Sequence, residues 1–106
     1  VCPLSLGDHV DHQLTRRAAE QIGRPLWYYA DYPYVLRQPA RLEELRQAGW
    51  KQETFPLSAA GLTAWQEAVA AHASQISTFW KNEATMRAAI ADYAAQAGGI
   101  ALWQMG

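Results

Sequence analysis

The sequence has one cysteine, no basic run and no long apolar stretch. Cys2 is the only cysteine among 106 residues, so no internal disulfide can form and we expect a reducing, cytoplasmic setting. Nine Lys and Arg against ten Asp and Glu give a formal net charge of -1, which argues against nucleic acid as a partner. The apolar runs fall far short of the roughly 18 residues that span a bilayer, so we expect no membrane segment.

What is present is a globular composition. Half of the residues are apolar (50%) and 18% are charged, which fits folded protein of about one domain in size. The chain opens on Val1-Cys2-Pro3-Leu4, which is typical of the end of a buried strand. We therefore expect residues 1–106 to be the carboxy-terminal part of a single domain that begins in polypeptide outside this chain.

Hydrophobic spacing predicts helices alternating with short strands. Leu14, Ala18 and Ile22 share one face of an amphipathic helix over 11–22, which Gly23 ends. Further helices are expected over 41–48, from a capping box at 63–66 through His72 to Ile76, and after Asn82 up to Gly98-Gly99. Strands are expected at 26–29, 50–57 (an edge strand) and 100–103. This order predicts an α/β fold.

The candidate metal-binding and catalytic residues lie in the stretch from His9 to His12. His12 falls in the first turn of the predicted helix, where the helix dipole disfavours imidazolium and keeps a ring nitrogen available for a metal such as zinc. His9 reaches the same region from the helix edge. Asp11 can accept an N–H from a neighbouring imidazole and fix its tautomer. The pattern also fits polar residues that cap a helix and bind nothing.

An ordered set of matches resembles one family. Pro3-Leu4-Ser5-Leu6-Gly7 followed by His9-Val10-Asp11-His12, the aromatic stretch from Trp27 to Tyr34, and a late helix with Ser74-Gln75 closely resemble the second half of the PIG-L (LmbE-like) zinc-dependent N-acetylglucosaminyl deacetylases. The resemblance implies a Rossmann-like three-layer sandwich, represented here by its C-terminal portion. It also implies hydrolysis of the N-acetyl group of a GlcNAc-type sugar or glycoconjugate.

The resemblance assigns roles to four residues. His12 would be the zinc ligand, and His9 would stabilise the tetrahedral intermediate or protonate the leaving amine. Asp11 would orient His9. Asp31 would contact the sugar, with the aromatic residues after the second strand near the substrate.

One signature of the family is absent. The segment Ala-His-Pro-Asp-Asp-Glu, which supplies two zinc ligands and the general base, does not occur in these residues, and His72 on a later apolar helix does not replace it. We therefore expect this chain alone to be inactive. An uncovered sheet edge should require a missing N-terminal half, another chain or self-association as a homo-oligomer. Two alternatives stay open: a non-catalytic sugar-binding or oligomerising module, and another metal-dependent amidohydrolase.

Overall fold

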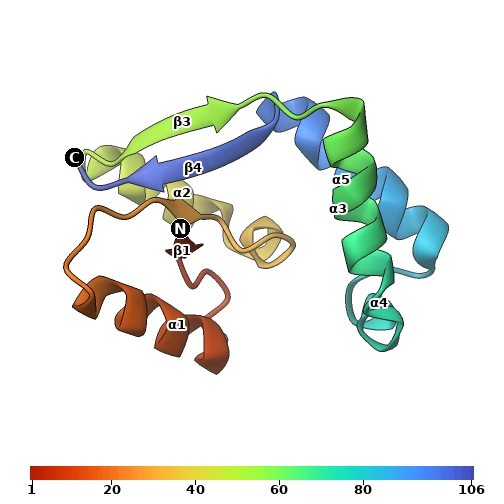
Figure 1. Cartoon of the computed structure of the whole chain (residues 1–106), viewed down its shortest axis with the longest axis horizontal. Helices are drawn as coiled ribbons and strands as arrows, with labels where there is room; N and C mark the ends of the chain where they lie inside the picture. Colours follow the sequence, from red (N-terminus) through yellow and green to blue (C-terminus); the bar gives the residue numbers. More distant parts are fainter. The chain divides into compact units, whose positions relative to one another are not determined.

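The computed structural model describes the whole chain, residues 1–106, and has the mixed α/β character expected from the sequence (Figure 1). The strands are β1 (Cys2–Pro3), β2 (Tyr28–Tyr29), β3 (Lys51–Phe55) and β4 (Ile100–Gln104). The helices are α1 (Val10–Gln21), α2 (Pro39–Gln47), α3 (Ala59–Ala70), α4 (Ala73–Phe79) and α5 (Glu83–Ala97), with a short 3-10 helix at Tyr34–Arg37. None of the helices is both long enough and apolar enough to cross a lipid bilayer.

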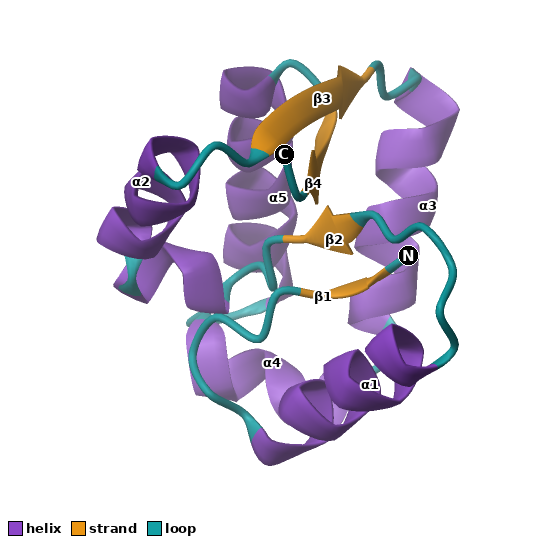
Figure 2. Cartoon of the chain, turned by 90° about the vertical axis from the view of Figure 1, so that its left-hand side faces the viewer, coloured by secondary structure: helices purple, strands orange, loops and turns teal.

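The four strands form one mixed sheet in the order β1-β2-β4-β3. Strands β1 and β2 are parallel and place Cys2 opposite Tyr28 (Figure 2). Strand β4 runs antiparallel to β2 and places Trp103 opposite Tyr28. Because β1 and β2 are parallel, the segments that follow them leave the sheet at the same end.

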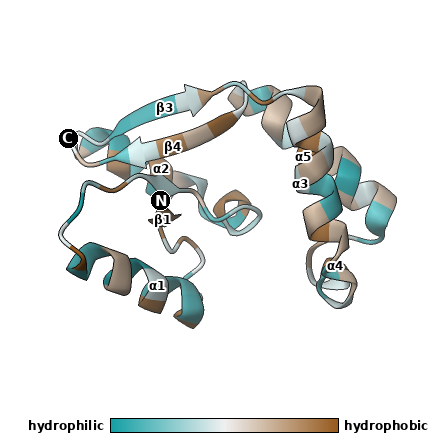
Figure 3. Cartoon of the chain, viewed as in Figure 1, coloured by the Kyte–Doolittle hydropathy of each residue, from teal (hydrophilic) through white to brown (hydrophobic).

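Strand β3 occupies one edge of this sheet, as its partly alternating sequence predicted. All five of its residues are exposed, and Figure 3 colours most of the strand as hydrophilic. At the opposite edge, β1 is only two residues long. The two edges therefore differ in kind, one polar and the other very short.

The chain divides into two compact units. The first contains Val1–Glu53 together with Ala101–Gly106, and the second contains Thr54–Ile100. The chain passes from one unit to the other within β3 and again at the start of β4. The sequence does not resemble a linker at these two positions, because the chain crosses between the units within strands.

In the first unit, the core consists of side chains from the strands and from the loops that follow β1 and β2. Leu4, Leu6, Val35 and Trp103 are buried together with Tyr28. The guanidinium of Arg46 lies over the ring of Trp103, 5.2 Å from its centroid, which is within the distance of a cation–π contact. Aromatic side chains thus provide much of the apolar area that holds this small sheet.

Helix α1 starts and ends within one residue of the predicted limits, but its apolar face is exposed. Leu14 and Ile22 are 60% and 70% exposed, and no residue of the helix is fully buried. The helix lies against β1 through a polar side chain instead: Arg16 donates a hydrogen bond of 2.8 Å to the carbonyl of Leu4. This bond satisfies a backbone acceptor beyond the end of β1.

The second unit begins with a helix whose start was predicted wrongly. The expected capping box at 63–66 lies inside α3, which starts at Ala59 after Ser58 accepts a hydrogen bond from the amide of Gly61. The predicted continuous helix is also broken, since His72 separates α3 from α4. Ser58 is an equally good capping residue five positions earlier, and helix formation extends to the first cap that the chain offers.

Helix α5 agrees with its prediction. The side chain of Asn82 accepts a hydrogen bond of 2.8 Å from the amide of Thr85, and Met86 and Ile90 are buried. Gly98 ends the helix in the left-handed conformation, at φ 75°. Helices α3 and α5 pack against each other, with the ring centroids of Trp65 and Tyr93 6.2 Å apart.

Candidate functional site

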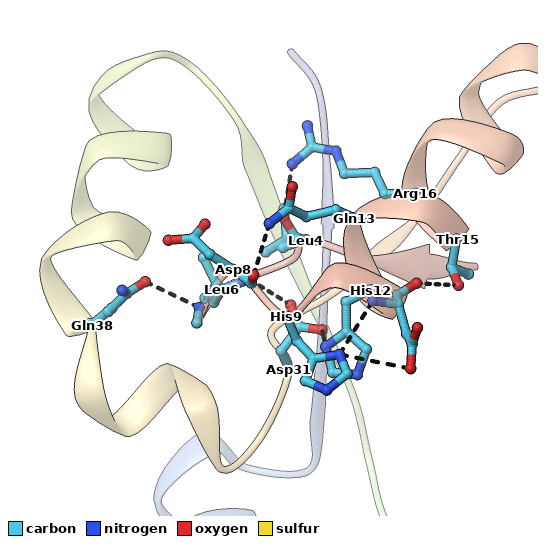
Figure 4. Close-up of polar contacts among 12 residues, drawn as sticks. Leu4, Leu6, Asp8, His9, His12, Gln13, Thr15, Arg16, Asp31 and Gln38 are labelled. Carbon is cyan, nitrogen blue, oxygen red and sulfur yellow. Dashed lines mark hydrogen bonds and ion pairs between the residues drawn. The ribbon is translucent and has the colours of Figure 1, made fainter.

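The candidate site lies where the parallel strands β1 and β2 end. The loop after β1 leads to His9 and His12 at the start of α1, and Asp31 follows β2 after a single residue (Figure 4). Open α/β sheets bind ligands at this end of their parallel strands. The topology therefore brings together side chains that are about twenty residues apart in the sequence.

Asp31 is an enclosed carboxylate. Its side chain has no exposed area, and one oxygen accepts a hydrogen bond of 2.9 Å from the backbone amide of Leu6. Burial raises the pKa of Asp31, while the amide of Leu6 and the nearby His12 oppose that rise. The backbone of Asp31 has φ 35°, a left-handed conformation that Asp tolerates better than most residues.

The second carboxylate oxygen of Asp31 lies against His12. Its distance from Nδ1 of His12 is 3.2 Å, although the angles are not those of a well-formed hydrogen bond. Nδ1 is buried, whereas the His12 side chain as a whole is 32% exposed. A carboxylate beside Nδ1 favours the tautomer with the proton on that nitrogen, which leaves the lone pair on Nε2.

His9 has the opposite hydrogen-bonding pattern. It is the N-cap of α1, and its Nδ1 accepts a hydrogen bond of 3.2 Å from the backbone amide of Asp11. An accepting Nδ1 carries no proton in the neutral ring, so the proton is on Nε2. The Asp11 carboxylate is 4.0 Å from Nδ1, too far for a hydrogen bond. In this structure the backbone amide of Asp11 orients His9, and an orienting role for its carboxylate stays a prediction.

The two imidazoles lie side by side and share an aromatic neighbour. Their ring centroids are 5.0 Å apart, and the ring of Tyr34 is 5.7 Å from His12 and 6.2 Å from His9. Gly7 makes this approach feasible: it has φ +88°, and a Cβ there would lie 2.7 Å from a ring carbon of Tyr34. Gly7 is therefore required both by its backbone conformation and by the position of the tyrosine.

The loop before the histidines is held by side chains from α2 and its start. The amide of Gly7 donates to Gln38 at 3.1 Å, and Arg41 contacts the carboxylate of Asp8 at 3.0 Å. Gln13 donates to the carbonyl of Asp8 at 2.7 Å. These contacts fix a segment in which Asp8 itself has φ 57°.

Within this chain the site does not form a complete metal centre. No group of three or more His, Cys, Asp or Glu side chains is arranged to hold a metal ion. His12 nevertheless fits the role of a single ligand, because its buried Nδ1 faces a carboxylate and its Nε2 is left for a cation. His72 occupies the N-cap position of α4 and makes no capping hydrogen bond through its side chain.

Sequence reasoning did not anticipate the pairing of Asp31 with His12. We expected Asp31 to contact a sugar; that contact stays a prediction, and the structure places the carboxylate against Leu6 and His12. The signal was available, since Asp31 and the histidines follow two strands that can be neighbours in a parallel sheet. Which strands pair, however, depends on long-range packing that spacing alone does not define.

The chain matches no protein-family model, no curated protein and no solved structure. The family resemblance noted from the sequence therefore stays a prediction, and the functional interpretation depends on the geometry of His9, His12 and Asp31.

Proposed function

We propose that this chain contributes one zinc ligand and one oxyanion donor to a hydrolase that removes the N-acetyl group from a GlcNAc-type sugar or glycoconjugate, on a Rossmann-like three-layer sandwich. The observation that carries the proposal is that two adjacent imidazoles have opposite polar neighbours at Nδ1. His12 has a carboxylate at Nδ1, and His9 has an amide donor at Nδ1. The first ring thus offers a lone pair at Nε2 and the second offers an N–H.

His12 would hold the metal. The enclosed carboxylate of Asp31, 3.2 Å from Nδ1 of His12, would keep the ring oriented, which is the usual role of a carboxylate behind a metal-binding histidine. When bound, zinc polarises the acetamide carbonyl and makes water a stronger nucleophile at neutral pH. The remaining ligands and the general base are not among these residues, so the proposal requires them from a missing N-terminal half or from another chain.

His9 would act on the reacting amide. Its Nε2–H can donate a hydrogen bond to the negative charge that develops on the carbonyl oxygen. The ring centroids of His9 and His12 are 5.0 Å apart, so this donor lies close to the proposed metal ligand. The ring of Tyr34 would form one wall beside both imidazoles, at centroid distances of 6.2 Å from His9 and 5.7 Å from His12.

Two substitutions separate these roles when they are made in the polypeptide that also contains the other ligands. His12→Ala should lower zinc content, whereas His9→Ala should retain zinc and slow acetate release by about 10²- to 10³-fold. His72→Ala is a matched control, because this histidine has no role in the proposal and both readouts should stay unchanged.

The measurements are zinc content by elemental analysis and acetate release from N-acetylated sugars. Equal loss of zinc in the His9 and His12 variants would contradict the division of roles. A wild-type protein that carries no zinc and releases no acetate from any N-acetyl sugar would contradict the proposed function itself.

A further inference from the structure

Helix α1, which carries His12, is attached to the rest of the first unit through polar side chains. Its large apolar residues Val10 and Leu14 are 64% and 60% exposed, and none of its residues is fully buried. The partly buried positions of the helix are His12, Gln13, Arg16 and Ala19. Because a helix is usually held to a sheet by burial of a large apolar face, α1 requires another kind of attachment.

Arg16 provides this attachment through three contacts with the rest of the unit. Its guanidinium donates a hydrogen bond of 2.8 Å to the carbonyl of Leu4, directly after β1. The same group lies over the rings of Tyr28 and Trp50, 5.1 and 5.9 Å from their centroids. Leu4 and Tyr28 are each 1% exposed, so Arg16 is bound to residues of the core. Glu20, one turn further along α1, accepts a hydrogen bond of 2.6 Å from Nε of Arg16 and restrains the side chain.

Arg16 and His12 lie on the same face of α1. They are four residues apart, which places their side chains one above the other along the helix (Figure 4). His12 contacts the carboxylate of Asp31 after β2, and Arg16 contacts the carbonyl of Leu4 after β1, so the helix is held at the ends of two neighbouring parallel strands. The contact between His12 and Asp31 is not a well-formed hydrogen bond, which makes Arg16 the stronger of the two attachments.

We propose that Arg16 is a positioning residue for His12. By holding α1 against the sheet, it keeps Nδ1 of His12 beside Asp31 and gives Nε2 one fixed direction toward the metal. The metal at Nε2 rests on the proposed function, whereas the position of the imidazole is a property of this chain alone. Lysine cannot take the place of Arg16, because an ammonium group has no planar face to lie over two rings while it donates to a carbonyl.

Two NMR measurements on the whole chain compare Arg16→Lys with Arg17→Lys, which makes the same chemical change at the next, exposed residue of α1. Long-range ¹H–¹⁵N NMR at mildly alkaline pH should show the Nδ1–H preference of His12 falling from about fivefold to about twofold in Arg16→Lys. Hydrogen exchange of the α1 amides should become about tenfold faster, with α5 unchanged. Arg17→Lys should match the wild type in both measurements.

The tautomer is read in folded molecules, so it separates positioning from stability. A merely structural Arg16 would lower the urea midpoint in Arg16→Lys and leave the tautomer of His12 unchanged below that midpoint, and this result would overturn the proposal. Unchanged hydrogen exchange of α1 in Arg16→Lys would overturn it as well.

Zinc affinity measures the consequence for the metal. In the polypeptide that contains the other ligands, Arg16→Lys should raise the zinc dissociation constant about tenfold, as expected when a ligand loses the group that orients it. Unchanged zinc affinity in a variant whose His12 has lost its tautomer preference would overturn the proposal. A wild type without zinc would contradict the proposed function instead, and the NMR measurements would still decide whether Arg16 positions His12.

Discussion

Asp31→Asn should reverse the tautomer of His12 without unfolding the chain. The amide of Leu6 is bonded to one carboxylate oxygen at 2.9 Å, and this buried donor still requires an acceptor in the variant. The oxygen of the new side chain is therefore held toward Leu6, and its NH₂ group faces Nδ1 of His12. Nδ1 then becomes the acceptor, and the ring proton moves to Nε2.

The size of the change follows from the contact between Asp31 and His12. No well-formed hydrogen bond joins Asp31 to His12, so their 3.2 Å contact should contribute less than the about 1.5–3 kcal/mol of a hydrogen bond to a charged group, and we take about 1 kcal/mol. This corresponds to a preference of about fivefold for the Nδ1–H tautomer in the wild type. In the variant, a neutral hydrogen bond of about 1 kcal/mol favours Nε2–H about fivefold.

Long-range ¹H–¹⁵N NMR of the imidazole rings at mildly alkaline pH reads the tautomers directly. The wild type should show Nδ1–H for His12 and Nε2–H for His9, and only His12 should change in the variant. Asn tolerates the left-handed backbone of position 31, so the urea midpoint should change little. Asp31→Ala leaves Leu6 without an acceptor and should lose about 1–3 kcal/mol. Wild-type His12 in the Nε2–H form, or an unchanged ring in Asp31→Asn, would refute the reasoning.

Three further predictions concern the packing of the chain. A Cβ at Gly99 would overlap the carbonyl oxygen of Phe55, whereas a Cβ at Gly23 meets nothing, and both glycines have positive φ. Urea denaturation should therefore show a loss for Gly99→Ala that exceeds that of Gly23→Ala by about 1–3 kcal/mol, and equal losses would contradict the overlap. Burial raises the pKa of Tyr93, so the native state holds the phenolic proton more tightly than the unfolded state does. The free energy of unfolding should fall as pH rises from about 10 through the raised pKa, and Tyr93→Phe should reduce that fall; an identical pH profile in the variant would count against burial as the cause. Burial also raises the pKa of the Cys2 thiol, so a disulfide reagent should label it slowly in the native chain and rapidly in urea; equal rates would show that the thiol is accessible.

The sequence was most informative where local chemistry decides the structure. Asn82 and Gly98 delimit α5 because a side-chain cap and a left-handed glycine act within one turn of the helix end. The limits of α1 were predicted for the same reason. The break at His72 was not predicted. Helices α3 and α4 have one continuous apolar pattern, and spacing alone cannot distinguish one helix from two.

The sequence could predict which residues form the candidate site, but it could not predict all of the contacts between them. His9 and His12 share one turn of helix, so their proximity follows from spacing alone. The contact of His12 with Asp31 depends on the pairing of β1 with β2, which is a property of the folded sheet. The exposed apolar face of α1 is similar: no pattern in the helix reveals that Arg16 is the residue that lies against β1.

The polar edge strand has a consequence for the behaviour of concentrated solutions. An unpaired strand can template the addition of other molecules and so seed fibrils. Lys51 and Glu53 put both signs of charge on β3, and desolvating these groups in a stacked array is unfavourable. At the other edge of the sheet, β1 offers only two residues for pairing with another molecule. Amyloid growth should therefore require unfolding first.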